Sequence, residues 1–493
     1  MSNLAQLITT AAAENPAARF GTFQQSDALP RVVDRARQVA EQFRSAGLGR
    51  GKVLAVIGTN SASYIVTWMA AQLLGVQTAL INPSYPDAFL AQMLDDLAPD
   101  AIAWIGRAPG EAAGRPLPQF DAGDAWDGSV VQWQDGPLTP AEGSAGEHCR
   151  PDEVAAFLHT SGTSGNPKFC ALSHGYFHRL GRFFADIMGF TRHDVVVNPL
   201  PLFHINPIGN GVVGALTGRA GFLSTERFSP TDFWAQVKGH GATALILHAP
   251  PANLLRTKTT AQDAQGHSVR VGFSCNPAFL AQFDIPIGIG GYGSTEAGGL
   301  CHHWTFRKDD AGLPPEGALH QAGQPRHDME VMLSDAGEIL VREKVPQVLF
   351  SGYRRGGVVE PALGPGGWFH TGDRGRLDDC GNLVFIERIS ESIRVNAEYV
   401  PIDFVEERLR QVPTLGDFAL WRIPSASRGH EAVVYTVAAD VEAEDIRVAV
   451  ADLPRYMRPT LLIQVDRIPR DAGVGKIQRR LLDTIPRLLV REL

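Results

Sequence analysis

The chain has 493 residues, of which 44% are hydrophobic and 20% charged, a composition typical of a globular protein with more than one domain. Its formal net charge of −8 disfavours a nucleic acid or an anionic membrane as a partner bound through bulk charge. The five cysteines include no CxxC pair, which indicates a reducing compartment and gives no zinc signature.

We expect no secretory signal and no membrane span, and therefore a cytoplasmic protein. Residues 1–20 lack a basic cluster followed by an apolar core. The most apolar stretch, residues 64–81, carries Gln72 and Gln77 and is interrupted by Gly75. We interpret it as a buried helix followed by a strand.

Helical and strand patterns alternate in the first part of the chain, which favours parallel sheets covered on both faces. Helices are expected at residues 29–48, 61–74, 87–97, 175–188 and 233–238. Strands are expected at residues 53–57, 76–81, 101–105, 154–158, 194–199, 244–248, 271–275 and 286–289. Residues 109–150 are rich in Gly, Pro and Asp and are expected to form a surface excursion.

The pattern changes to shorter β-like segments at residues 330–333, 338–342 and 348–350, which predict a small β-subdomain. A hairpin is expected between residues 375–377 and 382–386. Beyond it, helices at 400–411 and 443–453 and strands at 418–423 and 432–438 indicate a small α+β unit. We predict an α/β protein with a large, multi-subdomain N-terminal domain, residues 1–387, and a small α+β C-terminal domain, residues 388–493.

A run rich in hydroxyls and glycines follows the expected strand at 154–158 and reads His-Thr-Ser-Gly-Thr-Ser-Gly-Asn-Pro-Lys from His159 to Lys168. Glycine tolerates positive φ and adds no side chain, so the backbone N–H groups of such a loop can surround an oxyanion. The run lacks the Gly-Lys-Ser/Thr ending of a Walker P-loop. The alternative, a flexible Ser/Gly linker, explains none of the later motifs.

The run resembles the Thr-Ser-Gly-Thr-Thr-Gly-x-Pro-Lys loop of the adenylate-forming superfamily, which includes acyl- and aryl-CoA synthetases, luciferases and peptide-synthetase adenylation domains. Three later stretches resemble the same family in the same order: Gly291–Glu296, Trp368–Asp373 and Pro469–Lys476. The resemblance implies that the first loop binds the phosphates of ATP through Thr160, Ser161, Gly162, Thr163, Ser164, Gly165 and Lys168.

The second stretch, Gly-Tyr-Gly-Ser-Thr-Glu, resembles the family's Tyr-Gly-x-Thr-Glu motif. The resemblance implies that Tyr292 and Gly293 lie beside adenine, that Thr295 contacts the α-phosphate and that Glu296 holds Mg²⁺. A hard cation next to phosphates does prefer carboxylate oxygens. Residues 288–293 also satisfy GxGxxG, but their place deep in the chain argues against a dinucleotide fold.

The last two stretches imply further ATP contacts. By resemblance, Asp373 accepts hydrogen bonds from the ribose hydroxyls and Arg388 contacts ribose or phosphate, whereas an isolated Thr-Gly-Asp would be an ordinary turn. Lys476 matches the family's C-terminal lysine, which bridges the substrate carboxylate and the phosphate. The segment from Pro469 to Gly475 is one residue longer than the usual pattern. Ser390 matches the family's hinge, about which the small domain rotates.

The resemblance implies a ligase that uses ATP and Mg²⁺ to convert a carboxylic acid to an acyl-adenylate, releases pyrophosphate and then transfers the acyl group. His204 would line the acyl pocket as a gate, although a structural histidine is the alternative. The expected pocket residues are His204, Asn206, Ile208, Phe273, Ser274, Cys275 and Gly291. Ile208, Phe273 and Cys275 are apolar, and Asn206, Ser274 and Asn276 are the expected polar contacts. This set favours an uncharged aliphatic or aromatic acid, and the lack of a suitable Asp disfavours an α-amino acid.

The expected acceptor is the thiol of CoA, with an amine or a carrier-protein thiol as the alternative. CoA-using members commonly carry Gly-Gly-Glu-Asn after the hinge, and this chain has Asn396-Ala397-Glu398-Tyr399. The methyl group of Ala397 stands where pantetheine would pass. A catalytically silent ligand sensor is a further alternative, which the joint presence of the ATP-binding residue types disfavours.

Overall fold

The computed structural model describes residues 3–85, 87–106, 115–134, 146–160, 168–310, 321–389, 393–395, 398–400, 402–425, 429–471, 475 and 477–493. The chain divides into two compact units. The first contains residues 1–316, 321–332 and 340–371, and the second contains residues 317–320, 333–339 and 372–493. The division reflects packing within each unit and does not locate a hinge. The domain boundary at 387/388 therefore stays a prediction, and Ser390 lies outside the described residues.

The first sheet of the first unit has the strand order β20-β19-β9-β8-β4-β3-β5-β6-β7. Its central strands β8, β4, β3, β5 and β6 are parallel to one another. β3 is buried along its whole length, as expected for a strand covered on both faces. The bounds are β3 (Val53–Gly58), β4 (Gln77–Ile81), β5 (Ala101–Ile105), β6 (Gln119–Asp121), β7 (Val131–Gln134), β8 (Val154–Thr160), β9 (Lys168–Ser173), β19 (Gly352–Arg355) and β20 (Val358–Glu360).

Two sequence-based expectations need correction in this sheet. The excursion expected at residues 109–150 contains β6 and β7, and the indole Nε1 of Trp104 donates to Gln119 Oε1 at 2.9 Å, which satisfies both buried groups. The segment 348–350 is not a strand. The backbone N–H groups of Val348 and Leu349 both donate to the Glu343 carboxylate, so they are not available to a strand ladder.

In the second sheet, the strands that lie wholly in the first unit run in the order β16-β15-β14-β13-β12-β10-β11-β1-β2. The strands from β14 to β1 in this order are parallel. The bounds are β1 (Arg19–Thr22), β2 (Ser26–Ala28), β10 (Val195–Asn198), β11 (Gly221–Ser224), β12 (Ala244–Ile246), β13 (Val271–Phe273), β14 (Ile287–Tyr292), β15 (His302–Arg307) and β16 (Gln321–Pro325). Strands β17 (Met329–Leu333), β18 (Glu338–Glu343) and β21 (Phe369–Leu377) contain residues of both units.

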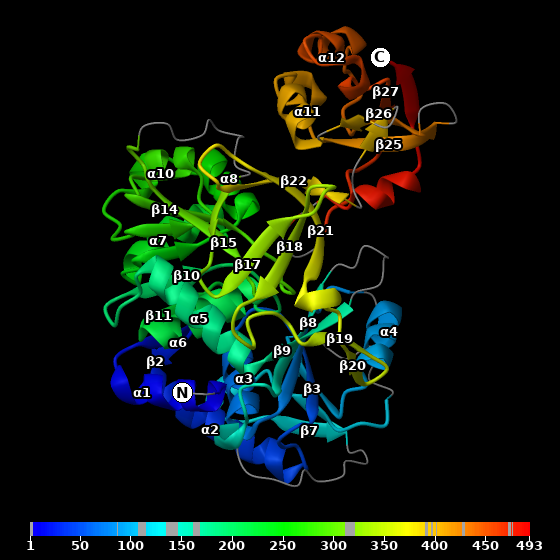
Figure 1. Ribbon diagram of the computed structural model, residues 1–493. Helices are drawn as coiled ribbons and strands as arrows, with labels where there is room; N and C mark the ends of the chain where they lie inside the picture. The colour runs from blue at the N-terminus through cyan, green and yellow to red at the C-terminus, as the bar shows by residue number, and fades with distance from the viewer. Residues whose placement is uncertain are drawn as a thin grey trace. The chain divides into compact units, whose positions relative to one another are not determined.

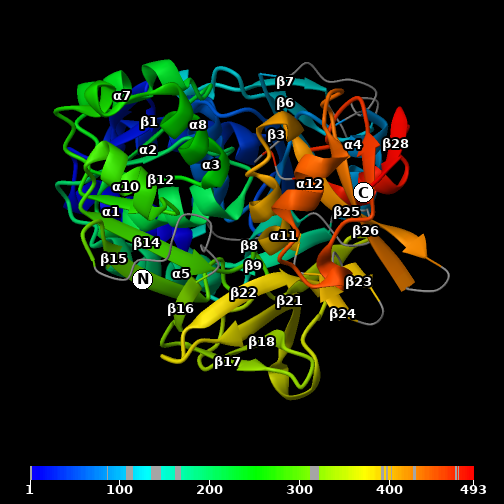
Figure 2. The same cartoon turned by 90° about the horizontal axis from the view of Figure 1, so that it is seen from above.

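Helix α3 (Ala62–Leu74) lies between the two sheets of the first unit (Figure 2), and all but one of its residues are buried. The Ser61 side chain accepts from the N–H of Tyr64 at the start, and Gly75 ends the helix with φ 77°. This confirms the helix expected at 61–74. The other helices of the unit are α1 (Leu4–Glu14), α2 (Leu29–Ser45), α4 (Asp87–Leu97), α5 (His174–Met188), α6 (Gly214–Gly218), α7 (Pro230–Gly239), α8 (Ala249–Lys258), α9 (Ala261–Ala264) and α10 (Pro277–Phe283) (Figure 1).

Residues Asn206–Val213 form a π-helix, a rare conformation that is frequently found at functional sites. Two glycines within it permit close packing. A Cβ at Gly209 would lie 2.7 Å from the Leu180 side chain, and a Cβ at Gly211 would lie 2.7 Å from the ring of Phe222. The two glycines therefore let the π-helix pack closely against the side chains of Leu180 and Phe222. The space beside each glycine is filled by protein atoms.

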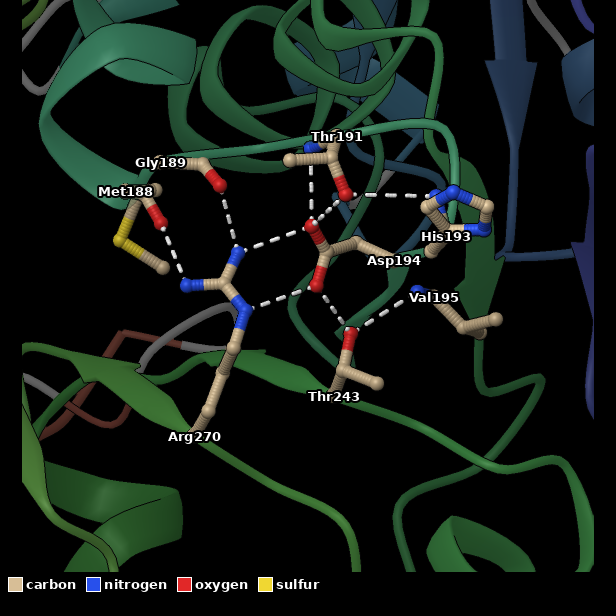
Figure 3. Close-up of polar contacts among 8 residues, drawn as sticks. All are labelled: Met188, Gly189, Thr191, His193, Asp194, Val195, Thr243 and Arg270. Atoms are coloured by element: carbon tan, nitrogen blue, oxygen red, sulfur yellow. Dashed lines mark hydrogen bonds and ion pairs between the residues drawn. The ribbon is translucent and has the colours of Figure 1, made fainter.

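The Asp194 carboxylate joins the start of β10 to three neighbouring segments (Figure 3). It accepts two hydrogen bonds from Arg270, at 2.8 Å each, and one from Thr243 Oγ1 at 2.7 Å. Arg270 also donates to the backbone carbonyls of Met188 and Gly189, which end α5. Burial raises the pKa of Asp194, but these hydrogen bonds outweigh burial and leave the pKa below its ordinary value. The network fixes the helix end against the amino ends of the parallel strands.

The second unit contains the hairpin of β21 with β22 (Leu383–Arg388) and a sheet of order β24-β23-β26-β27-β28, with β25 paired to β26. The sheet's bounds are β23 (Ile393–Val395), β24 (Glu398–Val400), β25 (Phe418–Ser425), β26 (Gly429–Thr436), β27 (Leu461–Gln464) and β28 (Leu489–Glu492). Side chains from α11 (Ile402–Leu409) and α12 (Ala443–Ala449), including Val405, Leu409 and Ile446, share one apolar core with Trp421 and Val434. This agrees with the α+β unit expected there.

Candidate active site at the carboxyl ends of the strands

The candidate site lies where β8 and β14 end. Thr160 is the last residue of β8 and pairs with Lys168, the first residue of β9. The loop between them contains Ser161, Gly162, Thr163, Ser164 and Gly165, which lie outside the described residues. Glu296 follows the end of β14. Carboxyl ends of parallel strands are where ligands bind in open α/β sheets.

Glu296 is contacted by hydroxyls from two other segments. Thr160 Oγ1 and the phenolic hydroxyl of Tyr353 each donate to Glu296 Oε1, both at 3.2 Å. The ammonium of Lys168 lies 4.9 Å from the centre of the Tyr353 ring, a cation–π contact. The structure thus brings together Thr160, Lys168 and Glu296, which the motifs predicted separately.

Tyr353 was missed in the sequence analysis. It lies on β19, where it pairs with Cys170 of β9, so only the pairing of these strands reveals its place. Burial, followed by the charge of Glu296, raises the pKa values of both Tyr353 and Cys170. Tyr353 therefore keeps its proton at neutral pH and acts as a hydrogen-bond donor to the carboxylate.

The backbone at Thr295 and Glu296 is held from both sides. The hydroxyl of Tyr176, near the start of α5, donates to the carbonyl oxygen of Thr295 at 2.9 Å, and the N–H of Phe350 donates to that of Glu296 at 3.2 Å. At Gly293 a Cβ would lie 2.6 Å from the backbone oxygen of Gly299, so only glycine fits there. This close approach explains the glycine of the motif without reference to a ligand.

A buried ion pair supports the turn that follows Glu296. Arg326 donates to both carboxylate oxygens of Asp328, at 2.6 and 2.8 Å, and to the carbonyl oxygens of Gly298 and Leu300. The Arg326 side chain is fully buried. The sequence analysis did not single out this pair, because nothing in the local pattern distinguishes it from surface charges.

Three histidines gather beside this site. The ring centres of His159 and His204 are 6.2 Å apart, and His204 also lies close enough to His248 to lower its pKa. Asn206 Nδ2 donates to His248 Nε2 at 3.1 Å, and Asn206 Oδ1 accepts from Asn198 Nδ2 at 2.9 Å. Burial, and then the proximity of His204, lower the pKa of His159 to about 3 and that of His248 to about 4.

The other expected pocket residues have mixed surroundings. Ile208 is buried in the π-helix, and the Phe273 ring packs edge-on against Phe184. Cys275 is buried in an apolar cluster with Phe279 and Phe283. Ser274 has φ 55°, an unusual conformation for a residue other than glycine, at the carboxyl end of β13. Gly291 lies on β14 opposite His303.

In the second unit, Arg388 Nε donates to Asp373 Oδ1 at 2.9 Å across the β21–β22 hairpin. Asp373 is buried. The two residues expected to bind ribose are therefore neighbours. Lys476 lies outside the described residues, and the adjacent Gly475 has φ 71° and donates its N–H to Asp471.

The residues around Glu296 suit a magnesium ion that travels with a nucleotide. Among the described residues, no group of three or more His, Cys, Asp or Glu could hold a metal ion. A single carboxylate fits Mg²⁺, which commonly takes one or two carboxylates and completes its shell with substrate phosphates and water.

A family model described as AMP-binding enzyme matches residues 25–354. The chain belongs to the AMP-binding enzyme family. This confirms the resemblance to the adenylate-forming superfamily drawn from the four motifs.

Curated relatives and solved structures extend the likeness to nearly the whole chain. The 4-coumarate–CoA ligase 3 of Oryza sativa subsp. japonica is 24% identical, covering 91% of this chain and 85% of its own. The oxalate–CoA ligase of Arabidopsis thaliana is 26% identical, covering 90% of each. The o-succinylbenzoate CoA synthetase of Bacillus subtilis, solved with the acyl-adenylate intermediate OSB-AMP, superimposes with a TM-score of 0.84 at 20% identity over 99% of both chains. The predicted α/β fold class is confirmed.

Searching the described part of the chain finds no helix that is both long and apolar enough to cross a membrane.

Proposed function

We propose that this protein is an AMP-forming acid–CoA ligase, which activates a carboxylic acid with ATP and then transfers the acyl group to the thiol of CoA. The observation that carries the proposal is the meeting of Thr160, Lys168 and Glu296 at the carboxyl ends of β8 and β14. The CoA ligase activity of the relatives that match over nine-tenths of the chain supports it.

We assign the ATP-binding roles as follows. Lys168 and the loop that begins at Thr160 bind phosphate, and Thr295 contacts the α-phosphate. Glu296 would hold Mg²⁺, which would offset the charge of the phosphates. Tyr292 and Gly293 border adenine, and Asp373 and Arg388 bind ribose.

Lys476 is the proposed catalytic lysine. Its positive charge would offset the repulsion between the substrate carboxylate and the α-phosphate as the two anions meet. Ser390 is the proposed hinge between residues 1–387 and 388–493. The acid pocket is proposed to include His204 as its gate.

CoA is the proposed acceptor because the curated relatives are CoA ligases. An amine or a carrier-protein thiol is the second candidate, favoured only by Asn396-Ala397 in place of the usual glycines. Ala397 lies outside the described residues. All five cysteines are free, which supports the reducing cytoplasm as the proposed location.

The test is pyrophosphate release with ATP, Mg²⁺ and a panel of carboxylic acids, each with and without CoA. Multiple turnovers that need CoA, with acyl-CoA detected by mass spectrometry, are the expected result. Release that stops after one turnover despite CoA would favour the amine or carrier-protein alternative. No release with any acid would overturn the proposed function.

A further inference from the structure

A group of polar side chains lies at the carboxyl edges of both parallel sheets in the first unit, and three of them, Asn198, Asn206 and His248, are joined by hydrogen bonds. We call it the histidine–asparagine cluster and define it as His159, Asn198, His204, Asn206 and His248. His159 is near the end of β8, Asn198 ends β10, and His248 follows β12 by two residues. His204 and Asn206 lie at the start of the π-helix region. Ligands bind at such edges, so polar side chains gathered there are placed to contact a ligand, whereas polar side chains in a core contact only protein.

The cluster shares a carboxyl edge with the partner of the proposed magnesium carboxylate. His159 directly precedes Thr160 at the end of β8, and the side chains of the two residues point to opposite faces of the strand. The Thr160 hydroxyl donates to Glu296, whereas His159 is bonded to the Asn82 N–H and the Tyr85 hydroxyl. The ring of Phe203 stacks on His159 with centres 6.0 Å apart, and His204 follows. The edge at which ATP is proposed to bind therefore also carries the histidine–asparagine cluster.

The hydrogen bonds determine which ring nitrogen of His248 carries the proton. The Asn206 amide is oriented by Asn198, whose Nδ2 donates to Asn206 Oδ1 at 2.9 Å, while Asn198 Oδ1 accepts from the N–H of Leu200. Asn206 Nδ2 must then donate to His248 Nε2, so the neutral ring carries its proton on Nδ1. The bond to Asn206 is the one hydrogen bond of the His248 ring to the residues that the structure describes, and the side chain is only partly buried, so this Nδ1–H is open to water or a ligand. The same π-helix carries Asn210, whose buried Oδ1 also has no partner there.

Charge decides which ligand group suits this donor. Burial holds His159 and His248 neutral at pH 7, with pKa values of about 3 and 4. Neutral rings give no countercharge to a second carboxylate, which would lose its hydration without an ionic partner. A purely apolar group that covered this donor would displace its water without offering an acceptor, and the cost of a donor left without a partner favours a ligand oxygen there.

We infer that the histidine–asparagine cluster recognises an uncharged oxygen on the acid, so that the substrate is a short carboxylic acid with a hydroxyl, carbonyl or amide group. The inference rests on the proposed function and narrows its substrate class. It adds one hydrogen-bonding group to the uncharged aliphatic or aromatic acid that the residue types led us to expect.

The experiment compares acids that differ by one group, using pyrophosphate release to obtain kcat/KM. The set is butanoate with 3- and 4-hydroxybutanoate, benzoate with 3- and 4-hydroxybenzoate, and succinate. We expect the best hydroxylated acid to exceed its unsubstituted parent by about tenfold or more, because a site built to bond a hydroxyl rejects the analogue that lacks it. A parent acid equal to or better than every hydroxylated form, or succinate as the best substrate, overturns the inference and leaves the ligase activity established.

Two variants test whether the histidine–asparagine cluster causes the preference for a hydroxylated acid. Asn206→Leu and His248→Phe remove the oriented amide and the ring donor, and each should reduce the ratio of kcat/KM between the hydroxylated acid and its parent to about twofold or less. His174→Asn is the matched control, since His174 is also a buried histidine but lies at the start of α5. An unchanged ratio in both cluster variants contradicts the inference. If a variant does not fold, as judged by circular dichroism, the acid series with the wild-type protein decides alone.

Discussion

At the scale of single residues, the site depends on how one carboxylate is held. Glu296 Oε1 accepts from both Thr160 and Tyr353, and Lys168 lies over the Tyr353 ring. The two hydroxyls orient the carboxylate before any cation binds. Tyr353 is thus a positioning residue for Glu296, the proposed Mg²⁺ ligand.

Tyr353→Phe should raise the Mg²⁺ concentration needed for half-maximal pyrophosphate release by about tenfold, the usual scale for a hydrogen bond to a charged group. The phenyl ring retains the contact with Lys168, so KM for ATP at saturating Mg²⁺ should change little. The measurement is a Mg²⁺ titration of the initial rate. An unchanged Mg²⁺ dependence would show that Tyr353 has only a packing role.

Lys476→Ala should abolish acyl-adenylate formation, because the charge of Lys476 is proposed to offset the repulsion between the substrate carboxylate and the α-phosphate. The change lies close to the chain end, so the melting temperature should stay within about 2 °C of wild type. Single-turnover pyrophosphate release tests this, with Lys258→Ala as a control for loss of an exposed lysine. Undiminished release from the Lys476 variant would remove this residue from the mechanism.

At the scale of elements, buried polar pairs connect segments that are distant in sequence. The hydrophobic periodicity of each segment gives no sign of these connections. Arg326 and Asp328 follow β16 and secure the turn at Gly298–Leu300, after Glu296. The alternation of strands and helices could be predicted because the hydrophobic period is local. This pair could not be predicted, because its burial depends on strands that meet only in the folded sheet.

Arg326→Met should destabilise the protein by about 3–5 kcal/mol, since Asp328 would remain buried and unpaired. Replacing both residues, as Arg326→Met with Asp328→Leu, should restore part of that loss. Urea unfolding of the three proteins, wild type included, measures the difference. A double variant that is no more stable than Arg326→Met alone would exclude this explanation.

At the scale of the whole molecule, buried histidines should set the response to acid. Burial, as the largest cause, lowers the pKa of His159 to about 3 and those of His174, His248 and His302 to about 4. All four lie in the first unit. In the unfolded chain histidine titrates near 6.5. The unfolded state therefore binds more protons than the folded state between about pH 6.5 and pH 4.

The free energy of unfolding should fall as the pH drops through this window, by up to about 1.4 kcal/mol per pH unit for each buried histidine. His174→Asn should reduce the slope by about one histidine's share, and substitution of the exposed His193 by Asn should leave it unchanged. Urea unfolding at several pH values from 4.5 to 6.5 measures the slope. A flat profile over this range contradicts the prediction.

The amino-acid sequence was sufficient for the family, the fold class and the types of group in the site, because the motifs and the hydrophobic periods are local features. It placed Thr160, Lys168 and Glu296 in separate motifs. Only the tertiary structure could show which of these groups touch. Thr160 and Glu296 are 136 residues apart in sequence, and Tyr353 and Glu296 are 57 apart.

The polar character of the expected acid pocket was also decided by folding. As residue types, Ile208, Phe273 and Cys275 predicted an apolar wall. In the structure, the end of β8, the end of β10 and the residues after β12 place His159, Asn198 and His248 around His204 and Asn206. Strand pairing brings these residues together from distant parts of the sequence, which no local pattern encodes. The inference about the substrate therefore rests on hydrogen-bond geometry and not on composition.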